Sequence, residues 1–339
     1  MPKDSRIIWL DYIRAIACVM VILLHSSSIY LNKLVDVNSV SWAFANFVDS
    51  ATRVCVPLFF MLSGFIFFNE RKPKFKNFAK LISALAFYTL LVFIVKKISY
   101  IAMPSLVEKT EFSFIKEPAF YHLWFFYPLL VMYFTSYIIN ASKFSLKPVS
   151  ISIIFLCVIF NPGVSNIINH VFGLQSNSYF MVDGDYFYYI VYSVIGAMFK
   201  QIEINKAKTV SILSLLVFTL LTIATFSLTQ IESVHSGYFV DIYYGYTSPL
   251  VILSSISMFA LFSSIKDKLP KSQIILSISK YSLGIYGIHA ILLYGIQKVF
   301  KYYEYPSLIM IPVISIIVLT SSFIFAMALR KIDKHGYVS

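Results

Sequence analysis

The sequence has few charged residues. Asp, Glu, Lys and Arg make up 13% of its 339 residues, whereas 58% are hydrophobic. Soluble globular domains average about 25% charged and about 45–50% apolar residues, so the composition excludes an ordinary soluble domain. No soluble segment is left once the apolar runs are assigned. We therefore predict an all-α fold, a polytopic integral membrane bundle that forms a single domain over residues 1–339.

Cysteine and cofactor motifs are also scarce. The three cysteines, Cys18, Cys55 and Cys157, lie inside apolar runs, which excludes a disulfide framework and indicates small buried hydrophobes. The sequence contains no phosphate-binding loop, no dinucleotide-binding glycine pattern and no metal-ligand spacing. We expect no metal. The net charge of +12 is attributed to membrane topology rather than to nucleic-acid binding.

Long apolar runs dominate what is present. A bilayer core takes about 20 apolar residues to cross, and this length predicts about ten transmembrane helices. The two termini and every second segment between spans lie on the same side of the membrane, and together they hold 19 of the 28 basic residues. Because basic residues gather on the cytoplasmic side, this distribution predicts that the N- and C-termini are cytoplasmic. The segment 161–185, with its Asn-Pro-Gly turn signal, is expected to be a loop. The predicted spans are 9–31, 46–68, 79–101, 123–140, 149–165, 186–202, 209–230, 242–263, 281–300 and 307–329.

The first span carries three polar residues. Asp11 and Arg14 are three positions apart, close enough to pair on one helix face. His25 follows Arg14 by eleven residues, which returns to nearly the same face roughly 16 Å along the axis. Ionisable groups at membrane depth are costly and usually mark a functional path. This stripe is therefore the first candidate site.

The second span carries a further ion pair. Asp49 and Arg53, at i and i+4, are expected to pair near the outer surface, at a depth that Arg53 could share with His25. Pro57 is expected to kink this helix. Ser63 and Gly64 form a narrow waist near the cytoplasm, which indicates either close helix packing or a functional contact.

Other candidates lie in later segments. The densest basic loop, NERKPKFKNFAK, contains Arg71, Lys72 and Lys80 and suits either anionic lipid or a phosphate-bearing cosubstrate. His122 opens the fourth span. Ser282, Tyr286 and His289 share one face of the ninth span, where His289 is either a helix-to-helix hydrogen bonder or a site residue.

Together these segments resemble the acyltransferase-3 family of membrane proteins, which includes bacterial surface-polysaccharide O-acetyltransferases. LDYIRAIACVMVILLH resembles the first-helix signature of the family, in which an arginine and a histidine, here Arg14 and His25, are needed for activity. VPLFFMLSGF, HLWFFYPLLVMYF and SLGIYGIHAILL resemble three later motifs in the expected order. The family commonly has Arg-x-x-Arg and then Pro-Tyr at the third span. Here Lys80 stands at the first arginine of this pattern and Ser83 at the second, and Phe87-Tyr88 stands in place of Pro-Tyr. The sequence therefore keeps one of the two basic residues and the tyrosine.

The resemblance implies an O-acetyltransferase of the bacterial inner membrane. Its cosubstrate would be cytoplasmic acetyl-CoA and its acceptor a hydroxyl of a polysaccharide or lipid-linked sugar at the outer face. His25 would act as general base or as an acetylated intermediate. Arg14, oriented by Asp11, would hold the donor, as would Ser63, Arg71, Lys72 and Lys80. Arg53 and His289 would support the acceptor side or the developing oxyanion, and His122 would be a further supporting residue.

Two other classes of function fit the intramembrane charges. One is a transporter or exporter of a glycan or lipid-linked sugar, although the sequence shows no inverted repeat. The other is a non-catalytic membrane partner of a synthase. Neither the acceptor, nor the acyl chain, nor the oligomeric state follows from the sequence.

Overall fold

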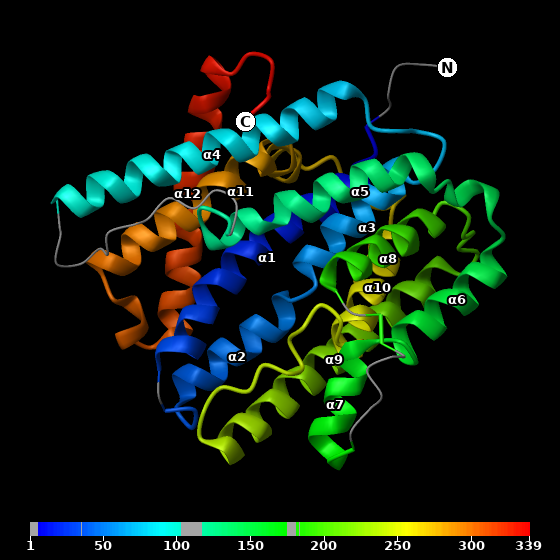
Figure 1. Ribbon diagram of the computed structural model, residues 1–339, viewed down its shortest axis with the longest axis horizontal. Helices are drawn as coiled ribbons and strands as arrows, with labels where there is room; N and C mark the ends of the chain where they lie inside the picture. The colour runs from blue at the N-terminus through cyan, green and yellow to red at the C-terminus, as the bar shows by residue number, and fades with distance from the viewer. Residues whose placement is uncertain (1–5, 35, 103–116, 175–180, 183) are drawn as a thin grey trace.

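The helices of the computed structural model form one bundle, described here over residues 6–34, 36–102, 117–174, 181–182 and 184–339. The described residues contain α-helices and short 3-10 helices and no strand. The predicted helical fold is confirmed, and both ends of the described chain lie at the same end of the bundle (Figure 1). The α-helices are α1 Ile8–Lys33, α2 Val40–Thr52, α3 Cys55–Phe67, α4 Phe75–Ala102, α5 Phe126–Ile138, α6 Leu146–Val158, α7 Pro162–Phe172, α8 Asp185–Met198, α9 Ala207–Ser236, α10 Pro249–Ser264, α11 Gln273–Val299 and α12 Ser307–Ile332.

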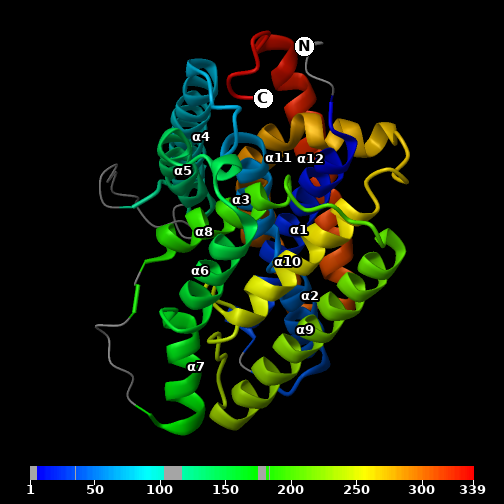
Figure 2. The ribbon, with the colours of Figure 1, turned by 90° about the vertical axis from the view of Figure 1, so that its right-hand side faces the viewer.

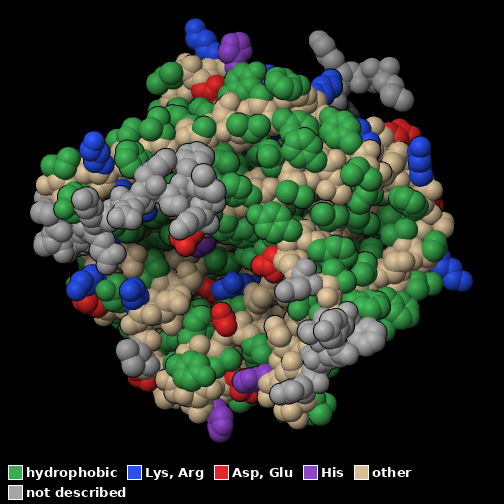
Figure 3. Space-filling model, in the orientation of Figure 1, with side chains coloured by type: hydrophobic (Ala, Val, Ile, Leu, Met, Phe, Trp, Pro, Cys, Tyr) green, Lys and Arg blue, Asp and Glu red, His purple; other side chains and the backbone are tan. Residues whose placement is uncertain are grey.

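The helix α1 lies at the centre of the bundle. It packs against α2, α3, α11 and α12, and α9 and α7 lie toward the periphery (Figure 2). Much of the visible surface is hydrophobic (Figure 3), and less than a third of the central window of α9 is buried. An apolar surface of this kind is expected where a helix faces lipid. The polar stripe of α1 is therefore enclosed by other helices rather than exposed to lipid.

The number of long spans differs from the predicted ten. Eight segments of the described chain are long and apolar enough to cross a membrane. The other two predicted spans correspond to α8 and α10, which have 14 and 16 residues. Most residues of both helices are buried in the bundle, and a helix enclosed by protein need not match the thickness of the hydrocarbon. Hydropathy alone does not separate this case from a full span.

Two local predictions were wrong. The predicted loop 161–185 contains the helix α7, because Asn161 caps this helix by accepting from the Gly163 N–H at 2.8 Å, and Pro162 occupies its first turn, where its missing N–H costs nothing. Residues 175–180 and 183 of that segment lie outside the described residues. The helix break in the second span falls at Arg53 and Val54, between α2 and α3, and not at Pro57. Pro57 lies in the first turn of α3, where a proline breaks no hydrogen bond of the helix and therefore does not kink it.

The helices α3 and α8 cross closely at two glycines. A Cβ atom added to Gly64 would lie 1.9 Å from the main-chain oxygen of Ser193, and one added to Gly196 would lie 1.9 Å from that of Met61. Two glycines thus let the two backbones touch. This confirms close packing at Gly64. Because the crossing fixes the orientation of α3, it also holds the neighbouring residue Ser63 in the lining of the pocket described below.

Candidate functional site

A pocket of about 690 Å³ opens at the end of the bundle where both termini lie. Five helices line it, each with residues spaced three or four apart, so that one face of each helix is presented. On α3 these residues are Phe59, Leu62, Ser63, Ile66 and Phe67. The pocket is therefore built mainly by regular helix faces, to which Arg71 of the segment between α3 and α4 and the residues just before α1 are added.

Basic side chains surround the pocket. Its described lining contains five cations and one carboxylate, Asp11. The cations come from different elements, so that no single stretch of sequence carries the charge. They are Arg6, Arg14, Arg71, Lys80 and Lys280. This charge suits a polyanionic ligand such as a phosphate-bearing cosubstrate.

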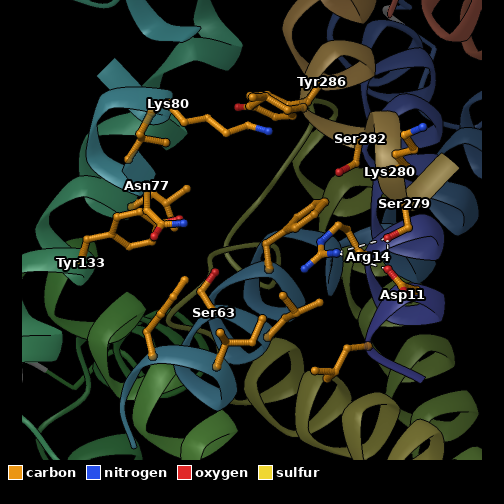
Figure 4. Close-up of a pocket in the computed structure, with 18 of the residues that line it drawn as sticks. Asp11, Arg14, Ser63, Asn77, Lys80, Tyr133, Ser279, Lys280, Ser282 and Tyr286 are labelled. Atoms are coloured by element: carbon orange, nitrogen blue, oxygen red, sulfur yellow. Dashed lines mark hydrogen bonds and ion pairs between the residues drawn. The ribbon is translucent and has the colours of Figure 1, made fainter. Parts of the chain in front are cut away.

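Asp11 organises one wall of the pocket (Figure 4). Its carboxylate accepts from Arg6 Nε at 2.6 Å, from Arg14 Nη1 at 3.4 Å and from the Ser279 hydroxyl at 2.5 Å. Arg14 also donates to Ser279 Oγ at 3.2 Å. The predicted Asp11–Arg14 pair is confirmed, and Ser279 ties it to α11. With 30% of its side chain exposed, Arg14 remains accessible to a ligand in the pocket.

The opposite wall carries Asn77, Lys80 and Tyr133 (Figure 4). The lysine side chain reaches across the pocket toward Tyr286 on α11. Because α4 and α5 supply this wall and α1 and α11 supply the other, the two walls belong to separate helix pairs. A ligand in the pocket would contact both pairs.

Three histidines meet beyond the deep end of the pocket. The rings of His25 and His289 are stacked with centroids 5.4 Å apart, and His122 lies edge-on to His289 at 5.2 Å. Tyr121 packs on His25 at 5.0 Å. We call His25, His122 and His289 the histidine cluster. It brings together the first, fourth and ninth predicted spans, which are far apart in the sequence.

Two members of the cluster are held in fixed orientations. His289 Nδ1 lies 2.6 Å from the Tyr286 carbonyl, and His122 Nε2 lies 3.1 Å from the Gly287 carbonyl. Because carbonyls only accept, each of these nitrogens must carry the proton. His289 Nε2 and His122 Nδ1 are buried and have no hydrogen-bond partner among the described residues. His25 differs in being only half-buried.

Arg53 is held next to this cluster. Its Nη2 lies 2.5 Å from Asp49 Oδ1, which confirms the predicted pair, and its guanidinium lies 4.3 Å from the Tyr244 ring centroid. Ser27, two residues after His25, donates to the other Asp49 oxygen at 3.4 Å. Asp49 is completely buried. This link brings Arg53 to the level of His25, as the sequence predicted.

Comparison with known proteins shows the family of the chain. The model of the acyltransferase-3 family, described as an acyltransferase domain, matches residues 7–330. The chain belongs to the acyltransferase-3 family. Searches of curated proteins and of solved structures returned no match.

This acyltransferase is a multi-pass membrane protein. Its polar residues divide into two groups along α1. Arg14 and Asp11 belong to the pocket, and His25 belongs to the histidine cluster. The predicted site residues Ser63, Arg71 and Lys80 line the pocket, and His122, His289 and Arg53 lie at or beside the cluster. All of them except Lys72 fall in one of the two groups.

Lys72 lies outside the described pocket lining. Its ammonium donates to the Ser136 carbonyl at 2.5 Å and to the Ile139 carbonyl at 2.8 Å, at the end of α5. Burial lowers the pKa of Lys72, and the nearby charge of Lys143 lowers it further. The sequence could not separate Lys72 from Arg71, because which of two adjacent loop residues faces a pocket depends on packing. A role of Lys72 as a helix cap fits its contacts better than donor binding.

Ser279 was not predicted, and Ser282 was predicted only to share a helix face with His289. Ser279 completes the Asp11 network, and Ser282 lines the pocket wall. Both lie on the face of α11 that also carries Tyr286, since the spacings of three and four residues return to the same side. Extending the predicted Ser282–Tyr286–His289 stripe by one turn would have found Ser279.

The C-terminal segment 333–339 contacts the helix that carries Lys80. The Lys80 ammonium donates to the main-chain oxygen of Ser339 at 3.3 Å, and Tyr88 donates to that of Val338 at 2.8 Å. Asp333 folds the segment back by accepting from the N–H groups of Val338 at 2.8 Å and Ser339 at 3.0 Å. Tyr88, at the position of the family's Pro-Tyr motif, is thus a structural contact of α4.

The Asp333 contacts predict a pH-dependent segment. Burial alone raises the pKa of Asp333, but the hydrogen bonds from Val338, Tyr337 and Ser339 lower it to about 2. Because the folded pKa lies below the ordinary value of about 3.9, the stabilisation is complete above that value and is lost as pH falls through about 2. Hydrogen exchange at Tyr337–Ser339 should stay slow down to about pH 4. Asp333→Asn should bring exchange close to the intrinsic rate of a free amide at each pH, and unchanged protection in that variant would contradict the assignment.

Proposed function

We propose that this acyltransferase moves an acetyl group from cytoplasmic acetyl-CoA to a hydroxyl of a cell-surface polysaccharide or lipid-linked sugar. The observation that supports this most is the position of a strongly basic pocket at one end of α1 and a histidine cluster further along the same helix. The membrane would be the bacterial inner membrane, with the pocket on the cytoplasmic side, where the basic connecting segments gather.

The pocket suits the donor. Coenzyme A carries phosphates at one end and the reactive thioester at the other, so the charged end would bind Arg6, Arg71 and Lys280 near the mouth. Arg14 and Lys80 lie deeper and would contact the phosphates or the chain that follows them. A volume of about 690 Å³ lies within the range of about 300–1,000 Å³ that is usual for small-molecule sites.

The reaction needs a base. An acceptor hydroxyl oxygen attacks the carbonyl carbon of the thioester while His25 accepts the hydroxyl proton. The C–S bond then breaks, and the thiolate takes the proton from the His25 imidazolium, which yields free coenzyme A and the sugar ester. Alternatively, His25 itself attacks the thioester and passes the acetyl group on. Arg53, which is held beside His25, would stabilise the negative charge that develops on the carbonyl oxygen.

Glycan analysis tests this function. Surface glycans of cells with the gene should be heavier by one acetyl group at a defined sugar than those of cells without it. The purified protein in liposomes should consume labelled acetyl-CoA. Transport of an unmodified glycan without consumption of acetyl-CoA would instead support the transporter alternative.

The donor site can be tested with two lysines of the same helix. Lys80 lines the pocket, whereas Lys76, one turn away on α4, is exposed and does not. Lys80→Ala should weaken acetyl-CoA binding about tenfold, as expected for a lost charge-assisted contact. Lys76→Ala should leave it unchanged apart from a small salt-dependent effect. Equal loss in both variants, measured by titration of the purified protein, would contradict the assigned donor site.

A further inference from the structure

The deep end of the pocket is closed by aromatic rings. The lining residue furthest from the mouth is aromatic on three of the lining elements. These residues are Phe59 on α3, Phe125 in the short helix Tyr121–Phe125 that leads into α5, and Tyr286 on α11, whereas on α4 the corresponding residue is Leu81. We call these three residues the aromatic floor. On α1, the lining residue furthest from the mouth is Arg14.

The rings of the aromatic floor touch one another. The centroids of Phe59 and Phe125 are 5.8 Å apart, and those of Phe125 and Tyr286 are 5.5 Å apart. Phe126 supports Tyr286 at 5.7 Å. These separations are ordinary packing contacts between aromatic rings. The three rings therefore form one connected layer, and a group that passes between two rings in contact must displace one of them.

Tyr286 separates the pocket from the histidine cluster. On the far side, its ring lies 5.5 Å from that of His289 and 5.6 Å from that of His122. Its hydroxyl donates to the main-chain oxygen of His122, which fixes the ring in place. The same side chain thus faces the pocket with one side and the cluster with the other.

We propose that the aromatic floor selects donors by the length of their acyl chain. This inference rests on the proposed function, because it assumes that an acyl-CoA occupies the pocket. With the phosphates at the basic mouth, the acyl group points toward the floor and must pass it to bring the carbonyl carbon to His25. Beyond the floor, the end of the acyl chain must lie between the floor and the histidine cluster, where Tyr286 packs on His289 and His122, so an acetyl group requires the smallest displacement and each further methylene requires more room. The selected donor class is acetyl-CoA over longer acyl-CoAs.

Widening the floor should relax this selection. The experiment compares kcat/KM for butyryl-CoA and acetyl-CoA in purified wild-type protein and in Phe59→Leu and Phe125→Leu. The wild type should prefer acetyl-CoA, and each variant should raise the butyryl-to-acetyl ratio about tenfold or more, the discrimination usual for one or two methylenes. A ratio is used because partial loss of folded protein affects both substrates equally.

Phe65→Leu is the matched control. Phe65 lies on the same helix as Phe59, is buried and packs on Trp9 at 5.0 Å, away from the pocket. Its ratio should equal that of the wild type. Unchanged ratios in both floor variants, with acetyl transfer retained, would overturn the proposal and leave the proposed function standing. A wild type that transfers neither acyl group would overturn the proposed function and the role of the floor together.

Discussion

Replacing His25 with alanine should reduce acetyl transfer about 100- to 10,000-fold, the range that a positioned general base contributes. A sugar hydroxyl is a poor nucleophile until its proton is removed. His25 is the half-buried member of the histidine cluster, whereas His122 and His289 are fully buried and each hold a carbonyl with one nitrogen. It is therefore the imidazole best placed to meet a substrate. The measurement is the initial rate of labelled acetyl transfer by protein of verified fold.

The control for this variant is His170→Ala. His170 pairs with Glu232 at 2.9 Å near the surface and lies far from the cluster in the fold, on α7. Loss of an exposed ion pair costs about 0–1 kcal/mol, so this variant should transfer at close to the wild-type rate. Retained turnover in folded His25→Ala would exclude His25 as the base. Incubation with acetyl donor alone, followed by peptide mass analysis, would distinguish a base from an acetylated intermediate.

The parts of the site that lie within one helix were predictable from the sequence. The Asp11–Arg14 and Asp49–Arg53 pairs follow from spacings of three and four residues, and helix geometry guarantees such neighbours whatever the fold. The division of α1 into a charged end and a histidine end follows in the same way. These features needed no knowledge of how the helices pack.

The contacts between helices could not be predicted in this way. The meeting of His25, His122 and His289 depends on three helices that are distant in sequence, and spacing within a helix says nothing of which face another helix will cover. Arg71 and Lys72 show the same limit at the scale of one loop, since one lines the pocket and the other caps α5. The family resemblance pointed to the segments that contain these residues, but only the packing of the helices shows which of them line the pocket and which form the histidine cluster.

The short length of two of the predicted spans could not be foreseen for a related reason. The apolar segments of α8 and α10 resemble transmembrane spans in composition, but they are short helices buried by their neighbours. Protein and lipid are both apolar surroundings, so hydropathy does not tell them apart. The Asn161-Pro162-Gly163 signal failed because residues that favour a turn also favour the start of a helix.

Gly64→Ala and Gly196→Ala should each prevent assembly of the native bundle or lower its thermal stability strongly. The added methyl group would lie 1.9 Å from a main-chain oxygen of the opposing helix in both cases, and a backbone cannot move aside as a flexible side chain can. Overpacking typically costs about 1–3 kcal/mol and occasionally more. Because α3 carries Phe59 and Ser63 on its pocket face, a shift of this helix should also reduce acetyl transfer.

Gly295→Ala provides the matched control for these two variants. Gly295 lies inside α11, and a Cβ atom there would have nothing within 4 Å. Alanine is the better helix former by about 1 kcal/mol, so this variant should be as stable as the wild type or slightly more stable. The three variants and the wild type are compared by heating each purified protein in detergent and measuring the fraction that remains monodisperse at each temperature. Wild-type stability of Gly64→Ala and Gly196→Ala would show that α3 and α8 do not cross as closely as the structure places them, and the orientation of the pocket face of α3 would then have to be revised.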